Sequence, residues 1–449
     1  MRPLFRSAPL WLALGLAHGA AMAAPSDALR AADPTTPVPP LRLALPDAQR
    51  LDAPSLPDDL AQALAAWREA NARVADFPRG HIDLLRWEKA QPSPARADGS
   101  ASAGPMDFGE ALRASLRLRP DLFTHRDMGP LERARVRVAY ATHVRELRHA
   151  WIDAVAQRER ERLMAAVLDA TRAGSELGRR MVRAGNWPQA RLLQEQAVEA
   201  QAWQAASDAT VAARGATERL ARPLGLWRAD EVEALAQRLP ATLPALPPLV
   251  DAPDAAGVEA AAIEAHPLLA IERTQAERSL RGVSAERWAD WSAAQDAALV
   301  ALPEPQAGRA EPPHLHDPRL LRDPRLLEAD SQRAKLLRGA TERRSMAREA
   351  WLTLHARHAS AQHAERVARE LRAPLQQESL QRYNGMLEST WQLLASARAH
   401  SAALDAALLA RRDFWRALAS WDALLAGADF NPDTPPTAAP AEGSATAGH

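Results

Sequence analysis

The chain has 449 residues with 56 basic and 56 acidic side chains, so its formal charge is zero, and it contains no cysteine. Balanced, interspersed charge creates no field that attracts a polyanion, so nucleic acid is not an expected partner. The missing thiols exclude disulfides, cysteine-ligated metals and a lipid on an N-terminal cysteine. With two tyrosines and six phenylalanines in an Ala- and Leu-rich chain, the composition predicts a nearly all-α protein.

The N-terminus has the three parts of a secretory signal peptide, which we assign to residues 1–23. Arg2 and Arg6 supply a basic start, an apolar run extends over residues 8–17, and Ala21-Met22-Ala23 forms a small-residue cleavage pattern. The apolar run is too short to cross a bilayer, which favours export with cleavage over a retained membrane anchor. We therefore expect an exported protein, located in the periplasm or associated with the outer membrane.

Both ends of the mature chain have compositions that are unusual for packed domains. Residues 24–107 form a Pro-rich leader, within which residues 57–75 carry apolar side chains at helical spacing and predict one short helix. Residues 431–449 are rich in Pro, Ala, Thr and Gly and are predicted to form a disordered tail. No segment after residue 23 is long and apolar enough to predict a transmembrane helix.

The central part contains an internal repeat. Arg148-His149-Ala150-Trp151 recurs as Arg348-Glu349-Ala350-Trp351, and a glycine follows each tryptophan by 34 residues, at Gly185 and Gly385. Long stretches with few helix breakers flank each glycine, so each copy predicts two long helices joined by a tight turn. We assign helical hairpin repeat 1 to residues 108–250. Repeat 2 takes residues 251–430, with a Pro-rich insertion at 303–324.

The breaks between the helices are predicted from glycine and proline. In repeat 1 we expect helices over 131–183 and 188–222, because Gly185 tolerates a left-handed turn and Pro188 suits the first position of a helix. In repeat 2 we expect a helix over 328–383, kinked at Pro374, and a last helix over 386–426.

Each hairpin turn is followed by a hydrophobic pair and small residues. Repeat 1 reads Val182-Arg183-Ala184-Gly185, then Leu192-Leu193 and Ala197. Repeat 2 reads Arg382-Tyr383-Asn384-Gly385, then Leu393-Leu394-Ala395 and Ala397. The repeats also open with Arg119-Pro120 and His266-Pro267 and close with Leu224-Gly225 and Leu425-Ala426-Gly427. As an ordered set over residues 108–427, these motifs resemble the TolC family of outer-membrane efflux proteins.

The resemblance implies a TolC-type α-barrel protomer made of two tandem, coiled-coil-like helical hairpins, assembled as a homotrimer. Its function would be that of a passive conduit or docking piece in a tripartite efflux or export system, without bond chemistry or cofactor. Its partners would be a periplasmic adaptor (membrane fusion) protein and an inner-membrane pump, met at the hairpin tips. The expected docking residues are Gly185, Asn186, Trp187, Pro188, Arg382, Tyr383, Asn384 and Gly385, with Trp187 as an exposed aromatic.

Two features depart from the family pattern. Gly385 comes one residue early relative to Tyr383 and the leucine pair, so we expect a different turn in repeat 2. Family members also carry two membrane-spanning β-strands in each repeat, for which residues 120–151 are too few and residues 309–317 too rich in proline and charge. We expect this chain to lack those strands. The alternative is therefore a soluble periplasmic coiled-coil scaffold or metal-handling protein that has lost channel activity.

The sequence offers only weak sites for chemistry. His314 and His316 lie two apart in a Pro-rich stretch, and His355 and His358 share one helix face. A solvated linker and ordinary helix-surface histidines explain these pairs better than a metal. No nucleophile, nucleotide or metalloprotease motif occurs, so we expect neither a catalytic nor a metal site and do not expect an enzyme. The transported substrate is not encoded in any motif.

Overall fold

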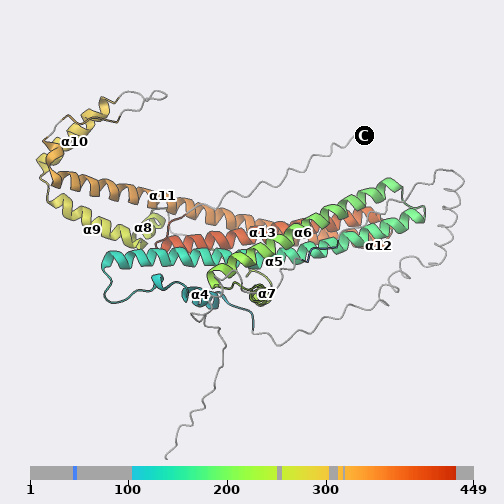
Figure 1. Ribbon diagram of the computed structural model, residues 1–449. Coiled ribbons are helices and arrows are strands. Elements are labelled where there is room, and N and C mark those ends of the chain that lie inside the picture. Colours follow the sequence, from blue (N-terminus) through green and yellow to red (C-terminus); the bar gives the residue numbers. More distant parts are fainter. Residues whose placement is uncertain (1–43, 48–103, 250–254, 303–311, 317–318, 431–449) are drawn as a thin grey trace, which may run out of the picture.

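The computed structural model describes residues 44–47, 104–249, 255–302, 312–316 and 319–430. All regular elements in these residues are helices, and no strand occurs among them. Figure 1 shows an elongated bundle in which two long hairpins lie side by side. The predicted all-α fold of tandem hairpins is confirmed. The predicted signal peptide, the helix at 57–75 and the tail at 431–449 lie outside the described residues.

Repeat 1 contains one long hairpin with short helices at its base. Pro130 provides the first helical position after Gly129, and the hairpin ends at Gly225, whose φ of 73° closes the helix in the left-handed conformation. Pro188 is the extended residue before the second long helix rather than its first position, and Pro223 lies inside the last turn. The elements are α4 (Phe108–Leu116), η1 (Pro120–Leu122), α5 (Pro130–Arg183), α6 (Gln189–Leu224) and α7 (Ala229–Arg238).

Repeat 2 contains a second hairpin with additional helices at the end away from its tip. Between the opening helix and the long hairpin, α9 packs along α11, and α10 projects beyond the bundle at the left of Figure 1. The sequence did not predict α9 and α10 as separate helices. The elements are α8 (Ala255–Ala265), α9 (Pro267–Arg281), α10 (Ala285–Val300), η2 (Leu320–Arg322), α11 (Pro324–Arg366), the π-helix η3 (Val367–Arg372), α12 (Ala373–Asn384) and α13 (Thr390–Leu425).

The repeated tryptophan motif lies in the core of each hairpin. Trp151 is buried among Leu147, Val155 and Leu220, and the ring of Phe108 meets it edge-on at 6.4 Å. Trp351 packs against the corresponding cluster around Ala350 in repeat 2. Full burial of a large apolar side chain contributes about 1.5–3 kcal/mol, so the buried Trp151 stabilises the base of its hairpin by about that amount and the half-buried Trp351 by less.

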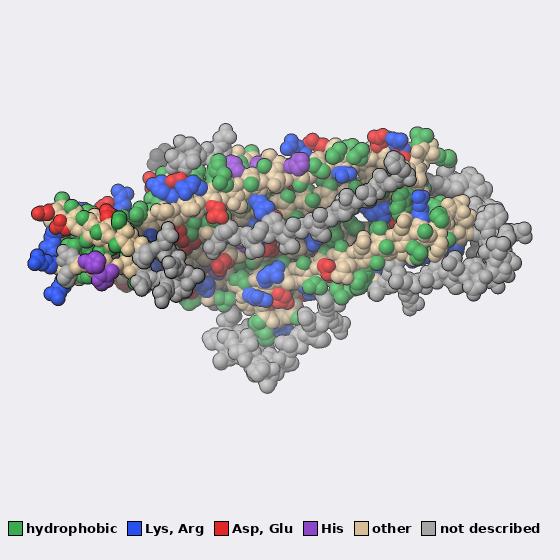
Figure 2. All heavy atoms as spheres, turned by 90° about the horizontal axis from the view of Figure 1, so that it is seen from above, with side chains coloured by type: hydrophobic (Ala, Val, Ile, Leu, Met, Phe, Trp, Pro, Cys, Tyr) green, Lys and Arg blue, Asp and Glu red, His purple; other side chains and the backbone are tan. Residues whose placement is uncertain are grey.

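The two hairpins are joined by ion pairs along the contact between α5 or α6 and α13. Arg160 pairs with Asp405 at 2.8 Å, and the buried Glu195 accepts from Arg398 at 3.1 Å. Nearer the base, Arg148 pairs with Asp422 at 2.8 Å. Basic and acidic groups also lie next to each other on the described part of the face in Figure 2. Matched charges therefore contribute to the contact between the repeats, together with apolar contacts such as the packing of Leu408 of α13 in the cluster around Trp151.

The connector between the repeats, residues 239–249, belongs to no helix and lies across the bundle. Side chains of three long helices donate to its carbonyl groups: Arg162 to Ala241, Trp415 to Pro244 at 3.1 Å, and His358 to Pro247 at 3.0 Å. Leu246 and Leu249 of the connector pack against an apolar cluster of α11 and α13. The connector is thus held through both its backbone and its leucines.

Among the described residues, no helix combines the length and the apolar composition required to cross a bilayer.

Candidate functional site: the hairpin tips

Tip one, residues 184–188, is a tight turn built on a glycine. Gly185 has a φ of 74°, in the left-handed region that side chains disfavour. The Gly185 amide donates to the Val182 carbonyl at 2.9 Å, and the Asn186 amide donates to the Met181 carbonyl at 2.9 Å. Glycine therefore adopts the backbone conformation of this turn without the strain that a side chain would add.

Trp187 is buried, with 9% of its surface exposed, so the expectation of an exposed tip aromatic is wrong. Its ring folds back over Gly178 of α5, where an added Cβ would lie only 3.3 Å from the ring. It meets Trp391, in the first turn of α13, edge-on at 6.5 Å. Arg191 lies 5.2 Å from the centre of the Trp391 ring and 5.9 Å from that of Trp187. These contacts hold the two tips together.

Tip two, residues 385–389, has the same hydrogen-bond pattern one residue later. Gly385 has an ordinary φ of −81°, and the left-handed residue is Met386, with a φ of 59°. The Met386 amide donates to Tyr383 at 3.0 Å and the Leu387 amide to Arg382 at 2.8 Å. Holding a residue with a side chain in this conformation costs about 1–2 kcal/mol. The glycine is thus displaced by one residue from the place where it would relieve strain.

Tip two presents an apolar pair to solvent. Met386 is 93% exposed and Leu387 is 74% exposed. Arg382 stays at the surface, paired with Glu378 at 3.5 Å and Glu388 at 3.4 Å. The preceding helix α12 has no buried residue. Of the predicted docking residues, Arg382, Asn384, Gly385, Gly185, Asn186 and Pro188 are exposed, Tyr383 is half-buried and Trp187 is buried.

The displaced glycine is explained by one extra residue in the helix of repeat 2. Gly185 follows Trp151 by 34 residues, whereas Met386 follows Trp351 by 35. The π-helix η3 lies between Trp351 and tip two, and a π-turn holds one residue more than an α-turn. It ends at Arg372, two residues before Pro374, which lacks an N–H and whose ring would press on the Glu370 carbonyl in a regular α-helix. The π-helix lies just ahead of Pro374, the residue at which the sequence predicts a kink.

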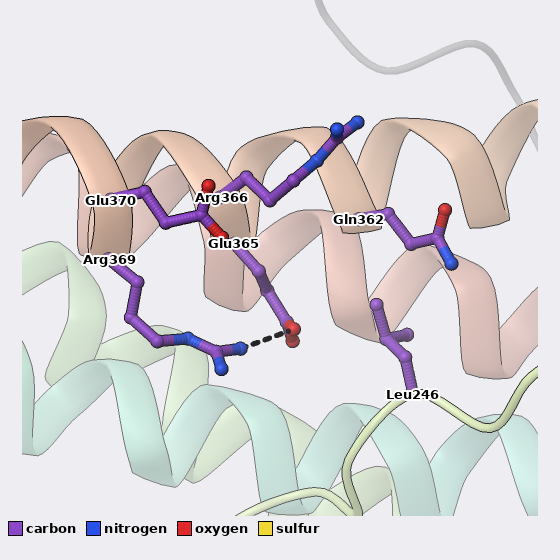
Figure 3. A pocket seen from close by; sticks show the side chains of 6 residues that line it. All are labelled: Leu246, Gln362, Glu365, Arg366, Arg369 and Glu370. Carbon is purple, nitrogen blue, oxygen red and sulfur yellow. Dashed lines mark hydrogen bonds and ion pairs between the residues drawn. The ribbon is translucent and has the colours of Figure 1, made fainter.

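A shallow hollow of about 410 Å³ lies beside the π-helix. In Figure 3, Glu365 and Arg369 point toward each other and pair at 3.0 Å, while Arg366 points away. Glu365 also accepts from Arg411 of α13 at 3.1 Å. The Glu365 carboxylate on the wall of the hollow is therefore already paired within the protein. The residues around the hollow are Leu246, Gln362, Glu365, Arg366, Arg369 and Glu370.

The candidate histidines make contacts within the protein. His314 and His316 lie edge-on with ring centres 4.9 Å apart, and the ring of His355 lies 4.3 Å from that of Trp351. His358 is buried, donates to the connector and packs against Phe414 at 5.2 Å. Within the described residues, no group of three or more His, Asp or Glu side chains is arranged to hold a metal.

A buried Ser115–His143 pair, which the sequence did not reveal, joins α4 to α5. The Ser115 hydroxyl donates to the Leu112 carbonyl at 3.0 Å and lies 3.0 Å from His143 Nε2. The hydroxyl proton therefore points to the carbonyl, and the imidazole donates to the serine. Burial lowers the pKa of His143 below its usual value, which keeps it neutral. The pair is a packing contact, because a nucleophilic serine would have to give its proton to the histidine.

No family model matches the sequence, and no curated protein matches it. Several solved structures are similar to the chain. A membrane protein from Pseudomonas aeruginosa is similar at 15% identity and a TM-score of 0.44, over 84% of this chain and 90% of that one. The outer-membrane channel OprN is similar at 18% identity and a TM-score of 0.43, over 87% of this chain and 98% of that one. The outer membrane protein VceC from Vibrio cholerae is similar at 13% identity and a TM-score of 0.43, over 83% of this chain and 97% of that one.

Proposed function

We propose that the protein is a TolC-like component of a tripartite efflux or export system, working as a passive conduit or docking piece in the periplasm and at the outer membrane. The observation that carries the proposal is the joining of both hairpin tips at one end of the bundle, with Trp187 and Trp391 in contact at 6.5 Å. The ordered motifs over residues 108–427 add the family resemblance. The proposed partners are a periplasmic adaptor and an inner-membrane pump, and the proposed assembly is a homotrimer.

The proposed docking surface is centred on tip two. Met386 and Leu387 are the most exposed large apolar residues of the described tips, and an exposed apolar pair of this kind favours a protein partner. Arg382 and Glu388 flank the pair and supply charges for orientation. Tip one contributes less to this surface, because its aromatic residue, Trp187, is buried within the protein.

The proposed mechanism is movement of helices without bond chemistry. Helix α12 has no buried residue, so it loses little apolar contact when it shifts. The strained Met386 and the π-helix η3 lie at its two ends. A partner that binds tip two more tightly when α12 is shifted would favour the shifted arrangement. The size of the effect is set by the difference between its affinities for the two arrangements.

The test is to separate outer membrane from soluble periplasm and to measure where the mature protein is recovered and in what oligomeric state. A stable trimer in the outer-membrane fraction supports the proposal. A soluble periplasmic monomer would contradict it and would leave the scaffold as the better explanation of the hairpins.

A further inference from the structure

Four residues of the leader, 44–47, lie on the first hairpin, more than a hundred residues away in sequence. Trp203 of α6 donates through Nε1 to the Pro46 carbonyl at 3.0 Å. Arg172 of α5 donates through Nη2 to the Asp47 carbonyl at 2.8 Å. Consecutive carbonyls are thus bound by one donor from each helix, so the segment crosses the line where α5 and α6 pack.

The recognition is directed at the backbone of an extended segment. Residues 44–47 belong to no helix, and their Ala44, Leu45 and Asp47 side chains are exposed. Pro46 has no amide hydrogen and holds φ in the extended range, so its carbonyl is available to a side-chain donor. Proline-rich extended segments bind to aromatic-lined surfaces in this way because little conformational entropy is lost.

The connector binds to the second hairpin by the same chemistry. It contains Ala245-Leu246-Pro247, matching Ala44-Leu45-Pro46 of the leader. The Pro247 carbonyl accepts from His358, and the Pro244 carbonyl accepts from a second indole, that of Trp415. The connector leucine packs into an apolar cluster, whereas Leu45 remains 44% exposed. Among the described residues, 44–47 are therefore held mainly by two hydrogen bonds, an arrangement that allows exchange.

The leader contact lies close to the tips. Arg172 precedes the end of α5 at Arg183 by eleven residues, or about 17 Å along the helix axis. The other end of the leader is fixed at the base, where the Met106 amide donates to the Arg238 carbonyl at 2.8 Å. The leader thus contacts the first hairpin at both its base and its tip-proximal half.

We propose that the surface formed by Arg172 and Trp203 is a binding site for an extended Leu-Pro segment, and that its occupant is residues 44–47 of the same chain. The site recognises the backbone carbonyl groups of the proline and of the residue that follows it, here Pro46 and Asp47. Since the natural occupant is tethered but weakly buried, a free peptide of the same sequence competes for the site.

The test is limited trypsin digestion of the full mature chain, followed by mass spectrometry of the bonds after Arg42 and Arg50, which flank the bound segment. Trp203→Phe removes the indole donor but keeps an aromatic ring, and Arg172→Gln shortens the second donor. We expect cleavage at both bonds to become roughly three- to ten-fold faster, the range expected when one hydrogen bond is lost. The bond after Arg96, in the same leader, serves as the internal reference and keeps its rate.

Trp351→Phe is the matched control, because the buried Trp351 Nε1 makes no hydrogen bond among the described residues. This variant loses an indole nitrogen without touching the leader, so its cleavage pattern stays that of the unmodified chain. Equal cleavage rates in Trp203→Phe, Arg172→Gln and Trp351→Phe would overturn the proposal.

Competition tests the site a second time. The peptide Leu-Ala-Leu-Pro-Asp-Ala-Gln, which copies residues 43–49 and contains no trypsin site, is added in excess to the full chain. We expect it to speed cleavage after Arg42 and Arg50 in the unmodified chain and to have no further effect in Trp203→Phe. The absence of any effect in the unmodified chain would contradict an exchangeable site.

A third measurement tests whether the occupant comes from the same chain. Because the chain has no native cysteine, a double variant with Leu45→Cys and Asp208→Cys takes up spin labels at these two positions and nowhere else. We expect one narrow distance distribution that persists when labelled protein is diluted with an excess of unlabelled protein. Loss of the short distance on dilution would show that the leader binds another copy and would overturn the same-chain assignment.

Discussion

The two hairpin tips have the same turn geometry but differ in how the turn is supported. Tip one places glycine at the left-handed position and packs Trp187 against Gly178. Tip two places Met386 at that position and exposes it, after a helix without buried residues. The first hairpin thus has a tip stabilised by packing, whereas the second has a tip that holds a strained residue and presents apolar side chains. This difference places the proposed docking surface on tip two.

The largest difference between the tips is expected from truncating their apolar side chains. Trp187→Ala removes a buried ring that supports both tips, and it should lower the free energy of unfolding by about 3 kcal/mol. Leu387→Ala removes an exposed side chain and should change it by less than about 0.5 kcal/mol. Urea unfolding of both variants measures the contrast. Similar losses in both would mean that tip one is not the more tightly packed tip.

Replacing the glycine of each tip by alanine should give a smaller difference in stability between the two tips. Gly185→Ala forces a side chain into φ 74° and should destabilise the protein by about 1–2 kcal/mol. Gly385→Ala has an ordinary φ and no atom closer than 3.5 Å to the new Cβ, so it should be neutral or slightly stabilising. A loss at Gly385 equal to that at Gly185 would contradict the displaced-glycine account. Thermal unfolding of the pair provides the comparison.

Acid should weaken the base of the hairpins, while leaving the tips intact. Burial lowers the pKa of both His143 and His266 below the usual value of 6.5, and His266 caps α9 by accepting from the Leu269 amide. As the pH falls through about 6.5, the unfolded chain therefore binds more protons than the folded chain. The stability that the two neutral histidines contribute is present above that pH and is lost below it. Hydrogen exchange between pH 7.5 and 5 should show α4 and α9 losing protection before residues 181–191. His143→Gln should reduce the pH dependence, and an unchanged dependence would exclude His143 as a source.

The smallest expected effect is relief of strain in tip two. Met386→Gly should raise the free energy of unfolding by about 0.5–1 kcal/mol, because relief of the left-handed strain exceeds the added flexibility of the unfolded chain. Met386→Ala keeps the strain and serves as the control. Urea unfolding distinguishes the two, and equal stability of both variants would show that Met386 is not strained.

Much of the fold could be predicted from the sequence, because the signals were local. Pro130 after Gly129, Gly185 before Pro188, and Gly225 each mark a helix end by backbone conformation alone. The burial of Trp187 depends on Trp391, about two hundred residues away, and no local pattern reports such a contact. The only local signal was a pair of glycines one helical turn apart, Gly174 and Gly178, which leaves room on α5 for a large side chain such as the Trp187 ring.

The features of tip two were predicted only in part. The early Gly385 indicated an unusual turn, but the sequence does not show where a helix absorbs an extra residue. The π-helix lies next to Pro374 and to α12, whose lack of buried residues is a property of the packed bundle. The leader contact at Trp203 was likewise invisible, because a tetrapeptide bound through its backbone has no distinctive side-chain pattern.

The most direct test of the central claim, that tip two is the docking end, is photo-crosslinking in living cells. A photoreactive residue replaces the exposed Met386, and a matched one replaces Val300, which is 88% exposed at the end of α10. We expect Met386 to crosslink to a periplasmic adaptor and Val300 not to do so. Crosslinking to the adaptor from Val300 alone, or from neither position, would contradict the assignment of tip two as the docking end.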